Sequence, residues 1–362
     1  MTIKATAMVF SEVGQPFENQ QVILNEIDHN EVLVRILYTT ICTSDIHTFT
    51  GKRSLACPCV LGHEIIGEII AKGKKINCDF NGHLLSVGDL VTWCVYAFDK
   101  TSEMAKKGIP QKSEGLYKYG HHQFKPDDGL NGGLNGGFAT HCVLKKGTAI
   151  FKLPDFLSYK QAAPINCTHA TIAGALRVAG YLENKNVMIT GTGMLGLSAC
   201  AMARESGAKN VFAMDINPER LVYAKKFGAN KLVDANLSAD EIRKLYPKEK
   251  IDVIIDTTGI PAVMELGIET LNIGGIAVWI GAVFNQPDTK INAEMIVRNL
   301  ITIKGLHNYT PNDLGFAVDF IAKNHSKYPF EELVGKEFLL EELPEAFESA
   351  KSGEHYRVGI RQ

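Results

Sequence analysis

Hydrophobic residues in the first part of the chain fall in short runs that alternate with polar turns. Two examples are EVLVRILYTT at 31–40 and HLLSVGDLVTWCVY at 83–96. Both are rich in the β-branched and aromatic residues that favour strands. Glycine and polar residues separate such runs up to about residue 155. This pattern predicts a compact domain built from β-strands.

From about residue 165 to 300 the pattern changes to apolar strands that alternate with helices. KNVMIT at 185–190 has the length and composition of a buried strand, and LSACAMARESG at 197–207 has helical spacing that stops at Gly207. The order then repeats through NVFAMD, NPERLVYAKKFGA, IDVIIDTTG and GGIAVWIGA. Because strands that alternate with helices form parallel sheets, we predict an α/β fold with a doubly wound parallel sheet.

The segment GTGMLG lies between the first of these strands and its helix. In such a motif the first glycine allows a tight turn, the second lets the backbone approach a pyrophosphate, and the third allows the helix to pack closely on the strand. The N-terminus of the helix attracts phosphate. The motif predicts a dinucleotide site at Gly191, Gly193, Met194, Leu195 and Gly196.

An acidic residue, Asp215, closes the second strand of this region. It stands at the distance from the glycine motif where a carboxylate receives the hydroxyls of the adenosine ribose. A carboxylate there repels a 2′-phosphate, so NAD(H) is favoured over NADP(H). Arg220 follows within the next helix and could contact a phosphate, which keeps NADP(H) as the alternative.

The composition narrows the class of protein. The chain has 362 residues, of which 45% are hydrophobic and 22% charged, with a formal net charge of −2. This is typical of a soluble protein of two domains, and it lacks the basic excess of nucleic-acid-binding proteins. The first ten residues lack the apolar core of a signal peptide, and no apolar stretch is long enough to span a bilayer. We therefore expect a cytoplasmic protein that acts on small molecules, without nucleic-acid or membrane partners.

The eight cysteines are scattered and form no compact disulfide framework. We expect free thiols or metal ligands at Cys42, Cys57, Cys59, Cys78, Cys94, Cys142, Cys167 and Cys200.

A histidine and a glutamate stand side by side at 63 and 64, just before an apolar strand and downstream of CTSDIH at 42–47. Neighbouring residues in a strand point to opposite faces. One of the two side chains therefore needs a buried partner that offsets the cost of its desolvation. A metal ion is a candidate for this partner.

Five motifs occur in the order CTSDIH, GHEIIGEI, APINCTHAT, GTGMLG and FAMDIN. Together they resemble the zinc-dependent medium-chain alcohol dehydrogenases over essentially the whole chain. The resemblance implies a GroES-like catalytic domain of residues 1–165 and 300–362, with a Rossmann NAD-binding domain of residues 166–299 inserted between these parts. It also implies a homodimer or homotetramer.

The same resemblance implies a catalytic zinc site. Cys42, His63 and Cys167 match the three protein ligands, which leave a fourth position for water or a substrate oxygen. Glu64 matches a nearby group that is an occasional ligand, and some relatives use a glutamate elsewhere instead of Cys167. The implied reaction is hydride transfer between NAD and an alcohol/aldehyde or alcohol/ketone pair.

Four further residues match other parts of the family's machinery. Asp45 matches the carboxylate that fixes the tautomer of the ligand histidine, and Ser44 matches the hydroxyl that touches the substrate oxygen and the cofactor ribose. His47 matches the end of the proton relay, with a plain surface histidine as the alternative. Arg357 matches an arginine near the cofactor pyrophosphate. The competing interpretations are a relative that has lost catalysis and a zinc-independent quinone-type reductase, and the retained ligands argue against both.

The chain departs from the family in the lobe where many members bind a second, structural zinc through four cysteines. The frame is present in FDKTSEMAKKGIPQKSEG, but Asp99, Ser102, Ala105 and Ser113 occupy the cysteine positions. Alanine and serine do not serve as zinc ligands. We therefore predict one catalytic zinc per subunit and no structural zinc.

Two segments bear on the substrate. TFTGKRS and GIPQKSEGLYKYGHH resemble the alcohol dehydrogenases associated with phosphonate metabolism. Lys52 and Arg53 could pair with a phosphonate or phosphate group. The alternative is a solvated basic turn, with a polyol or simple alcohol as the substrate. The second segment adds four residues of equally open role, Lys112, Lys118, His121 and His122.

One stretch, DDGLNGGLNGGFAT at 127–140, is dominated by glycine and asparagine. Such a composition predicts a mobile loop that crosses the surface. A lid formed by residues 129–137 is the alternative.

Overall fold

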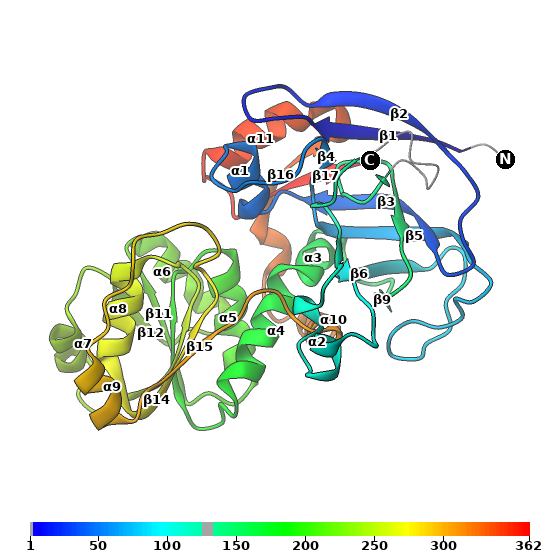
Figure 1. Ribbon diagram of the computed structural model, residues 1–362. Helices are drawn as coiled ribbons and strands as arrows, with labels where there is room; N and C mark the ends of the chain where they lie inside the picture. Colours follow the sequence, from blue (N-terminus) through cyan, green and yellow to red (C-terminus); the bar gives the residue numbers. More distant parts are fainter. Residues whose placement is uncertain (1–2, 125–132) are drawn as a thin grey trace. The chain divides into compact units, whose positions relative to one another are not determined.

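The computed structural model describes residues 3–124 and 133–362, and it divides into two compact units (Figure 1). Unit 1 comprises Met1–Cys167, Thr310–His325 and Phe330–Gln362. Unit 2 comprises Thr168–Tyr309 and Ser326–Pro329. The chain thus leaves unit 1, builds unit 2 and returns, as expected for an inserted domain.

Unit 1 is built mainly from β-strands. They are β1 (Ile3–Phe10), β2 (Glu18–Leu24), β3 (Val32–Thr40), β4 (Cys59–Val60), β5 (Glu64–Lys72), β6 (Leu90–Ala97), β7 (Tyr117–Lys118), β8 (His141–Leu144), β9 (Thr148–Lys152), β16 (Val334–Leu339) and β17 (Arg357–Arg361). The helices are α1 (Thr43–Phe49), α2 (Glu103–Lys106), α3 (Tyr159–Ala162), α10 (Pro311–Asn324) and α11 (Leu343–Lys351), with short 3₁₀ turns η1 (Pro110–Lys112), η3 (Ala163–Asn166), η5 (Phe330–Leu333) and η6 (Leu340–Glu342).

The strands of unit 1 form two sheets. One has the order β2-β1-β4, and the other follows β16-β17-β3-β5-β6-β7, with β8 beside β3 and β9 beside β6. In the second sheet Thr40 of β3 lies opposite both Gly359 of β17 and Glu64 of β5. The C-terminal strand therefore brings residues near 357 next to the start of β5, almost 300 positions earlier in the chain.

Helix α1 is anchored in the core of unit 1 by aromatic contacts at its C-terminal end. Its last residue, Phe49, stacks on Phe17 with ring centroids 5.3 Å apart and contacts Phe347 of α11 at 4.9 Å. These large rings bury apolar area that would otherwise face water. The helix that carries Ser44, Asp45 and His47 is thereby held on a rigid base.

The predicted surface loop at 127–140 is wrong for its described part. Residues 125–132 lie outside the described residues, and they include positions 129–132 of the proposed lid. Residues 134–139 are buried. A β-carbon on Gly136 would come within 2.1 Å of the carbonyl oxygen of Val60, and one on Gly137 within 2.5 Å of the hydroxyl of Thr39. These glycines are required because the backbone passes tightly against β3 and β4, not because it is mobile.

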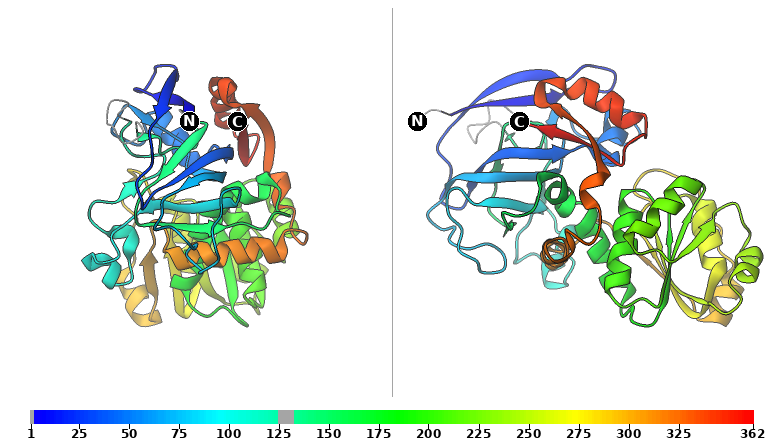
Figure 2. Two further views of the ribbon diagram at one scale, coloured as in Figure 1. Left: turned by 90° about the vertical axis from the view of Figure 1, so that its right-hand side faces the viewer. Right: turned by 180° about the vertical axis from the view of Figure 1, so that it is seen from behind.

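Unit 2 is a parallel sheet with helices on both sides (Figures 1 and 2). Its strands are β10 (Asn186–Thr190), β11 (Asn210–Asp215), β12 (Lys231–Asp234), β13 (Ile251–Asp256), β14 (Leu271–Trp279) and β15 (Thr302–Gly305), in the order β12-β11-β10-β13-β14-β15. Its helices are α4 (Thr168–Ala179), α5 (Met194–Glu205), α6 (Pro218–Ala224), α7 (Ala239–Leu245), α8 (Pro261–Thr270) and α9 (Ala293–Asn299), with the 3₁₀ turn η4 (Lys225–Phe227). This is the predicted doubly wound fold.

The return to unit 1 begins at Thr310, ten residues later than the predicted boundary at 300. The reason is β15, which pairs in parallel with β14 and adds a sixth strand to the sheet of unit 2.

Among the described residues, no helix has the length and apolar character needed to cross a membrane.

Candidate metal centre and cofactor site

Three segments of unit 1 meet at a cluster of potential metal ligands. Cys42 is the residue before α1, His63 immediately precedes β5, and Cys167 follows η3. One ligand atom from each residue lies within 4.8 Å of the others. Within the described residues, these three form the one group of at least three His, Cys, Asp or Glu side chains that could hold a metal ion. A tetrahedral zinc with Zn–S near 2.3 Å keeps its ligand atoms roughly 3.5–3.8 Å apart. The donor set and its spacing therefore fit zinc after a small contraction.

Asp45 orients the imidazole of this cluster. Its Oδ1 lies 3.2 Å from Nδ1 of His63, while Oδ2 accepts a hydrogen bond from the backbone N–H of Cys42 at 3.0 Å. Because a carboxylate accepts, Nδ1 carries the proton and Nε2 is left to face the cluster. Ser44 Oγ lies 3.3 Å from that Nε2. Asp45 and Ser44 thus contact opposite nitrogens of the His63 imidazole.

Glu64 lies outside the ligand cluster, although it follows His63 directly. Its carboxylate accepts bonds from Arg357 Nε at 2.7 Å and Arg357 Nη2 at 2.9 Å, and a third from the hydroxyl of Thr40 at 2.5 Å. Glu64 is fully buried, so an unpaired charge there would be costly, and this two-pronged ion pair compensates it. Of the two roles expected for Glu64, this pairing favours a group beside the cluster over a direct metal ligand.

Arg357 was expected near a cofactor pyrophosphate. The structure buries its guanidinium inside unit 1, where Nη2 also donates to Cys42 Sγ at 3.5 Å. The adjacent His63 and Glu64 therefore have two different buried partners. Asp45 serves the histidine, and Arg357 serves the glutamate.

The groups around the cluster favour the thiolate form of Cys42. A hydrogen bond from Cys167 and the positive charge of Arg357 hold the pKa of Cys42 well below its usual value. The same hydrogen bond, together with burial, holds the pKa of Cys167 well above it. Burial opposes a charged His63, but Asp45 and Cys42 raise the pKa of its imidazole. In the metal-free protein Cys167 and His63 therefore retain protons that a metal must displace.

Zinc affinity is accordingly expected to rise with pH. The raised pKa values of Cys167 and His63 mean that both protons are still bound near neutral pH, and each proton released on binding strengthens the apparent affinity by about tenfold per pH unit. Competition with a chelator of known affinity at pH 6, 7 and 8 measures this slope. An affinity that does not change over this range would contradict the protonation scheme.

The basic turn after α1 is linked to the same cluster. Arg53 Nη1 lies 2.9 Å from Nε2 of His121, whose Nδ1 lies 3.0 Å from the carbonyl of Tyr119. The imidazole of His121 packs against that of His63, with ring centroids 5.0 Å apart. Arg53 is half-buried, whereas Lys52 is exposed. The turn is therefore more than a solvated basic segment, and His121 is its link to the cluster.

His47 lies on α1 and is half-buried. Burial lowers its pKa, and the neighbouring charges of Lys52 and Arg53 lower it further. The neutral imidazole, which can accept a proton, therefore persists to more acidic pH than in an exposed histidine.

The glycine motif of unit 2 forms the turn between β10 and α5. Gly191 has φ +85°, a left-handed conformation that favours glycine. A β-carbon on Gly196 would lie 1.8 Å from the carbonyl oxygen of Gly191, whereas one on Gly193 would meet nothing within 4 Å. The first and third glycines thus serve the turn and the packing, and the second leaves open space beside the backbone. Met194 and Leu195 open the helix.

Asp215 lies at the end of β11 next to this turn. Its Oδ2 accepts bonds from the N–H and the hydroxyl of Thr192, both at 2.7 Å, and its Oδ1 accepts one from the N–H of Asn217 at 2.9 Å. Thr192 had no role in the sequence interpretation, since it occupies a variable position of the glycine motif. It ties the motif to the acidic residue. Arg220 lies on α6, whose first turn is capped by Asn217.

The lobe that lacks its cysteines is held by hydrogen bonds. Ser102 caps α2, and its hydroxyl lies 2.8 Å from that of Ser113. Asp99 accepts bonds from the N–H and the hydroxyl of Thr101, both at 2.8 Å. The serines that replace two cysteines therefore bond to each other across the lobe.

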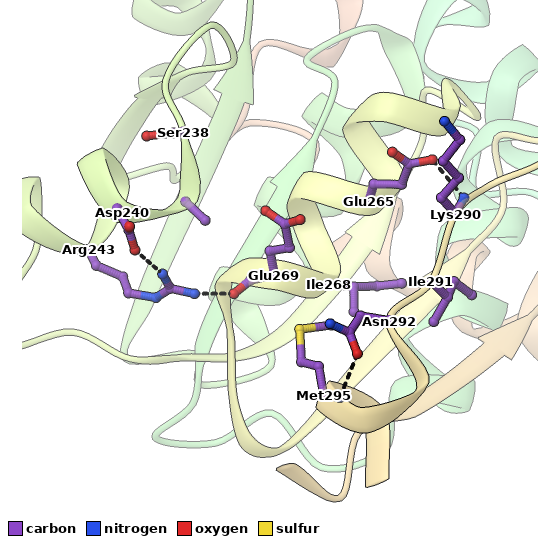
Figure 3. A pocket seen from close by; sticks show the side chains of 11 residues that line it. Ser238, Asp240, Arg243, Glu265, Ile268, Glu269, Lys290, Ile291, Asn292 and Met295 are labelled. Atoms are coloured by element: carbon purple, nitrogen blue, oxygen red, sulfur yellow. Dashed lines mark hydrogen bonds and ion pairs between the residues drawn. The ribbon is translucent and has the colours of Figure 1, made fainter. Parts of the chain in front are cut away.

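A cavity of about 400 Å³ lies in unit 2, lined by residues of α7, α8 and the segment before α9 (Figure 3). Two contacts join polar groups of its lining: Arg243 pairs with Asp240 at 2.6 Å, and the backbone N–H of Lys290 donates to Glu265 at 2.7 Å. None of the candidate site residues lines it. The cavity is therefore separate from both the cluster of unit 1 and the glycine motif of unit 2.

Both units contain segments that match families of known proteins. Residues 28–155 match the family described as alcohol dehydrogenase GroES-like domain, and residues 195–323 match the family described as zinc-binding dehydrogenase. An L-threonine 3-dehydrogenase from Paraburkholderia phytofirmans is 27% identical over 98% of this chain and 96% of its own.

Solved structures share the whole fold. An alcohol dehydrogenase from Thermotoga maritima superposes with a TM-score of 0.92 at 27% identity, over 99% of each chain. A zinc-binding dehydrogenase from Sinorhizobium meliloti, bound to NADP, superposes with a TM-score of 0.85 at 20% identity, over 99% of this chain and 100% of its own.

These matches define the class as zinc-binding dehydrogenases, which are oxidoreductases. More narrowly, the chain belongs to the zinc-binding medium-chain alcohol dehydrogenase family.

Proposed function

We propose that the protein is a zinc-dependent, NAD-linked dehydrogenase that interconverts an alcohol with an aldehyde or ketone. The observation that supports this most is the convergence of Cys42, His63 and Cys167 within 4.8 Å. Three protein ligands leave one position of a tetrahedral zinc for a substrate oxygen, as in catalytic rather than structural sites. When bound there, zinc would polarise that oxygen as a Lewis acid.

The chain's own residues would handle the proton of the alcohol. Asp45 keeps Nδ1 of His63 protonated and so fixes which nitrogen faces the cluster. Ser44 Oγ, which lies beside that nitrogen, would accept the hydroxyl proton of an alcohol. His47, on the same helix and with a lowered pKa, would receive the proton and release it to water.

NAD would bind at the glycine motif of unit 2. Gly193 leaves room for the pyrophosphate beside the N-terminus of α5, and Asp215 supplies a carboxylate for the ribose hydroxyls. The Sinorhizobium meliloti relative binds NADP, so the shared fold leaves the choice open. The preference for NAD rests on Asp215, whose negative charge disfavours a 2′-phosphate. Arg357 stays proposed as a pyrophosphate ligand, which would require it to donate beyond its pair with Glu64.

For the substrate we propose a short hydroxy compound that carries a phosphonate or phosphate group. The support is Arg53, a half-buried cation that is linked through His121 to the candidate ligand His63. A neutral polyol or simple alcohol is the second candidate, favoured by the alcohol dehydrogenase from Thermotoga maritima among the similar structures.

The reaction is tested with purified protein loaded with zinc. Hydroxyalkyl phosphonates, polyols and short alcohols are supplied with NAD at constant pH, and NADH absorbance is recorded. The proposal expects NADH to form with at least one of these classes and to disappear when the matching aldehyde or ketone is added. Absence of turnover in both directions with zinc bound would refute it.

Replacement of His47 by glutamine is expected to lower turnover by roughly 10²-fold, in the range typical of general acid–base groups. It should also remove the acidic limb of the pH–rate profile, because the imidazole whose pKa sets that limb is gone. Zinc content should not change, since His47 lies outside the ligand cluster. Rates between pH 5 and 9 and metal analysis check this, and an unchanged profile would assign His47 to the surface.

A further inference from the structure

Arg53 is fixed at both its backbone and its guanidinium. Its N–H donates to the carbonyl of His47 at 3.0 Å, which holds the turn after α1. Its Nη1 lies 2.9 Å from Nε2 of His121. A long side chain that is held in one orientation has already lost much of its rotational freedom. Less entropy would then be lost when Arg53 binds a ligand.

The hydrogen bonds of His121 form a consistent chain. The carbonyl oxygen of Tyr119 can only accept, so Nδ1 of His121 carries the proton. Nε2 is then unprotonated, and its lone pair accepts a hydrogen bond from Arg53. This contact uses one of the five N–H groups of the guanidinium, so two-pronged binding of an oxyanion stays available. Because the rings of His121 and His63 are 5.0 Å apart, the arginine is held close to the candidate metal ligand.

A second cation lies next to the residue that holds Arg53. The carbonyl of Lys118, on the short strand β7, accepts a bond from the N–H of His121 at 3.3 Å, and the side chain of Lys118 is half-buried. Burial together with the charges of Arg53 and Lys112 lowers the pKa of Lys118. In the described part of the chain, no carboxylate forms an ion pair with Arg53 or Lys118. Like charges brought together and partly desolvated destabilise a protein unless an anion joins them. Such an arrangement is typical of functional sites.

We propose that Arg53 and Lys118 form an oxyanion-binding subsite beside the candidate metal centre, and that His121 is the positioning residue that holds Arg53 in it. The subsite binds the anionic end of a short hydroxy compound. This end is a phosphonate, a phosphate or a carboxylate group. This rests on the proposed function. It replaces Lys52, the exposed neighbour chosen from the sequence, with Lys118, which is 66 positions further along the chain.

The test compares three alcohols of similar size that differ in charge: 2-hydroxyethylphosphonate, 3-hydroxypropanoate and 1-propanol. Replacing Arg53 or Lys118 with alanine should lower kcat/KM for an anionic alcohol by roughly tenfold to a hundredfold, the range expected for a charge-assisted hydrogen bond. The rate with 1-propanol should change by less than about twofold, and Arg53→Lys should recover part of the loss because a point charge remains. Lys106→Ala, an exposed lysine of the same lobe, is the matched control and should change neither.

The two anionic alcohols distinguish the source of the oxyanion. A loss confined to the phosphonate assigns the subsite to phosphonate or phosphate groups, and a loss confined to 3-hydroxypropanoate assigns it to carboxylates. Equal losses for charged and neutral alcohols, or no loss with either anion, would overturn the subsite.

Two measurements separate this proposal from the proposed function. Methylphosphonate has no hydroxyl to oxidise, and it should raise the melting temperature of the wild-type protein but not of Arg53→Ala. This holds even if none of the alcohols is oxidised, an outcome that would refute only the dehydrogenase. His121→Phe keeps the ring against His63 but removes the acceptor for Arg53. It should raise KM for the anionic alcohol by about tenfold while kcat for 1-propanol and zinc content stay unchanged. A fall in kcat for all three alcohols would make His121 merely structural.

Discussion

Replacement of Cys42 by alanine is expected to remove the bound zinc and with it turnover. Zinc sites of four ligands contribute about 10–16 kcal/mol in total, so one thiolate accounts for roughly 3–4 kcal/mol, or on the order of 10²–10³ in affinity. Cys42 should lie at the upper end, since Arg357 and Cys167 already favour its charged form. Arg357 would keep its ion pair with Glu64, so the fold should survive the change.

Metal analysis after dialysis, together with the rate of NADH formation, measures this loss. Cys78→Ser is the matched control, because Cys78 is an exposed thiol outside the cluster. The control and the wild-type protein should both retain one zinc per chain. Two zinc ions per chain would contradict the interpretation of the lobe at Asp99–Ser113, and a Cys42→Ala variant that keeps both zinc and turnover would contradict the assignment of the ligands.

The parts of the fold that could be predicted are those with local causes. The glycine motif between β10 and α5 needs a left-handed residue at 191 and an absent side chain at 196, and both requirements are visible in consecutive residues. The buried strands β10, β11 and β13 are continuous apolar runs, as parallel strands covered on both faces should be. Strands β12 and β15 were missed because each is only four residues long.

The parts that could not be predicted depend on contacts between distant residues. The adjacent His63 and Glu64 indicate that buried partners exist, but not that the partner of Glu64 is Arg357 on the last strand. Pairing of β17 with β3 brings these two together, and sheet order is not encoded locally. The same limit explains Arg53, whose contact with His121 spans 68 positions. Sequence reasoning finds such residue types without finding their partners.

The buried stretch at 134–139 shows a second limit, since a glycine-rich composition has two opposite causes. Glycine is used where the chain must move freely and also where another backbone approaches too closely for a side chain. Composition cannot distinguish these cases. The contacts of Gly136 and Gly137 with β4 and β3 decide for the second.

Asp215 is the residue through which unit 2 is expected to select its cofactor. Changing it to alanine removes the acceptor for the ribose hydroxyls, so kcat/KM with NAD should fall by roughly tenfold to a hundredfold. The value with NADP should stay level or rise, because the repulsion of a 2′-phosphate disappears. Initial rates with both cofactors at fixed alcohol concentration measure the ratio.

Alanine at 215 also releases Thr192, whose N–H and hydroxyl both bond to Asp215, so part of its effect could reflect a loosened glycine turn. Asp215→Asn separates the two contributions, because its amide oxygen can still accept from Thr192 while the negative charge is gone. If the charge sets the preference, the asparagine variant should shift the NAD/NADP ratio toward NADP nearly as far as alanine does. Asp234→Asn is the matched control, since Asp234 ends the neighbouring strand in register with Asp215, and it should leave the ratio unchanged. Equal losses with NAD and NADP in both Asp215 variants would instead show that this carboxylate holds the turn and does not choose the cofactor.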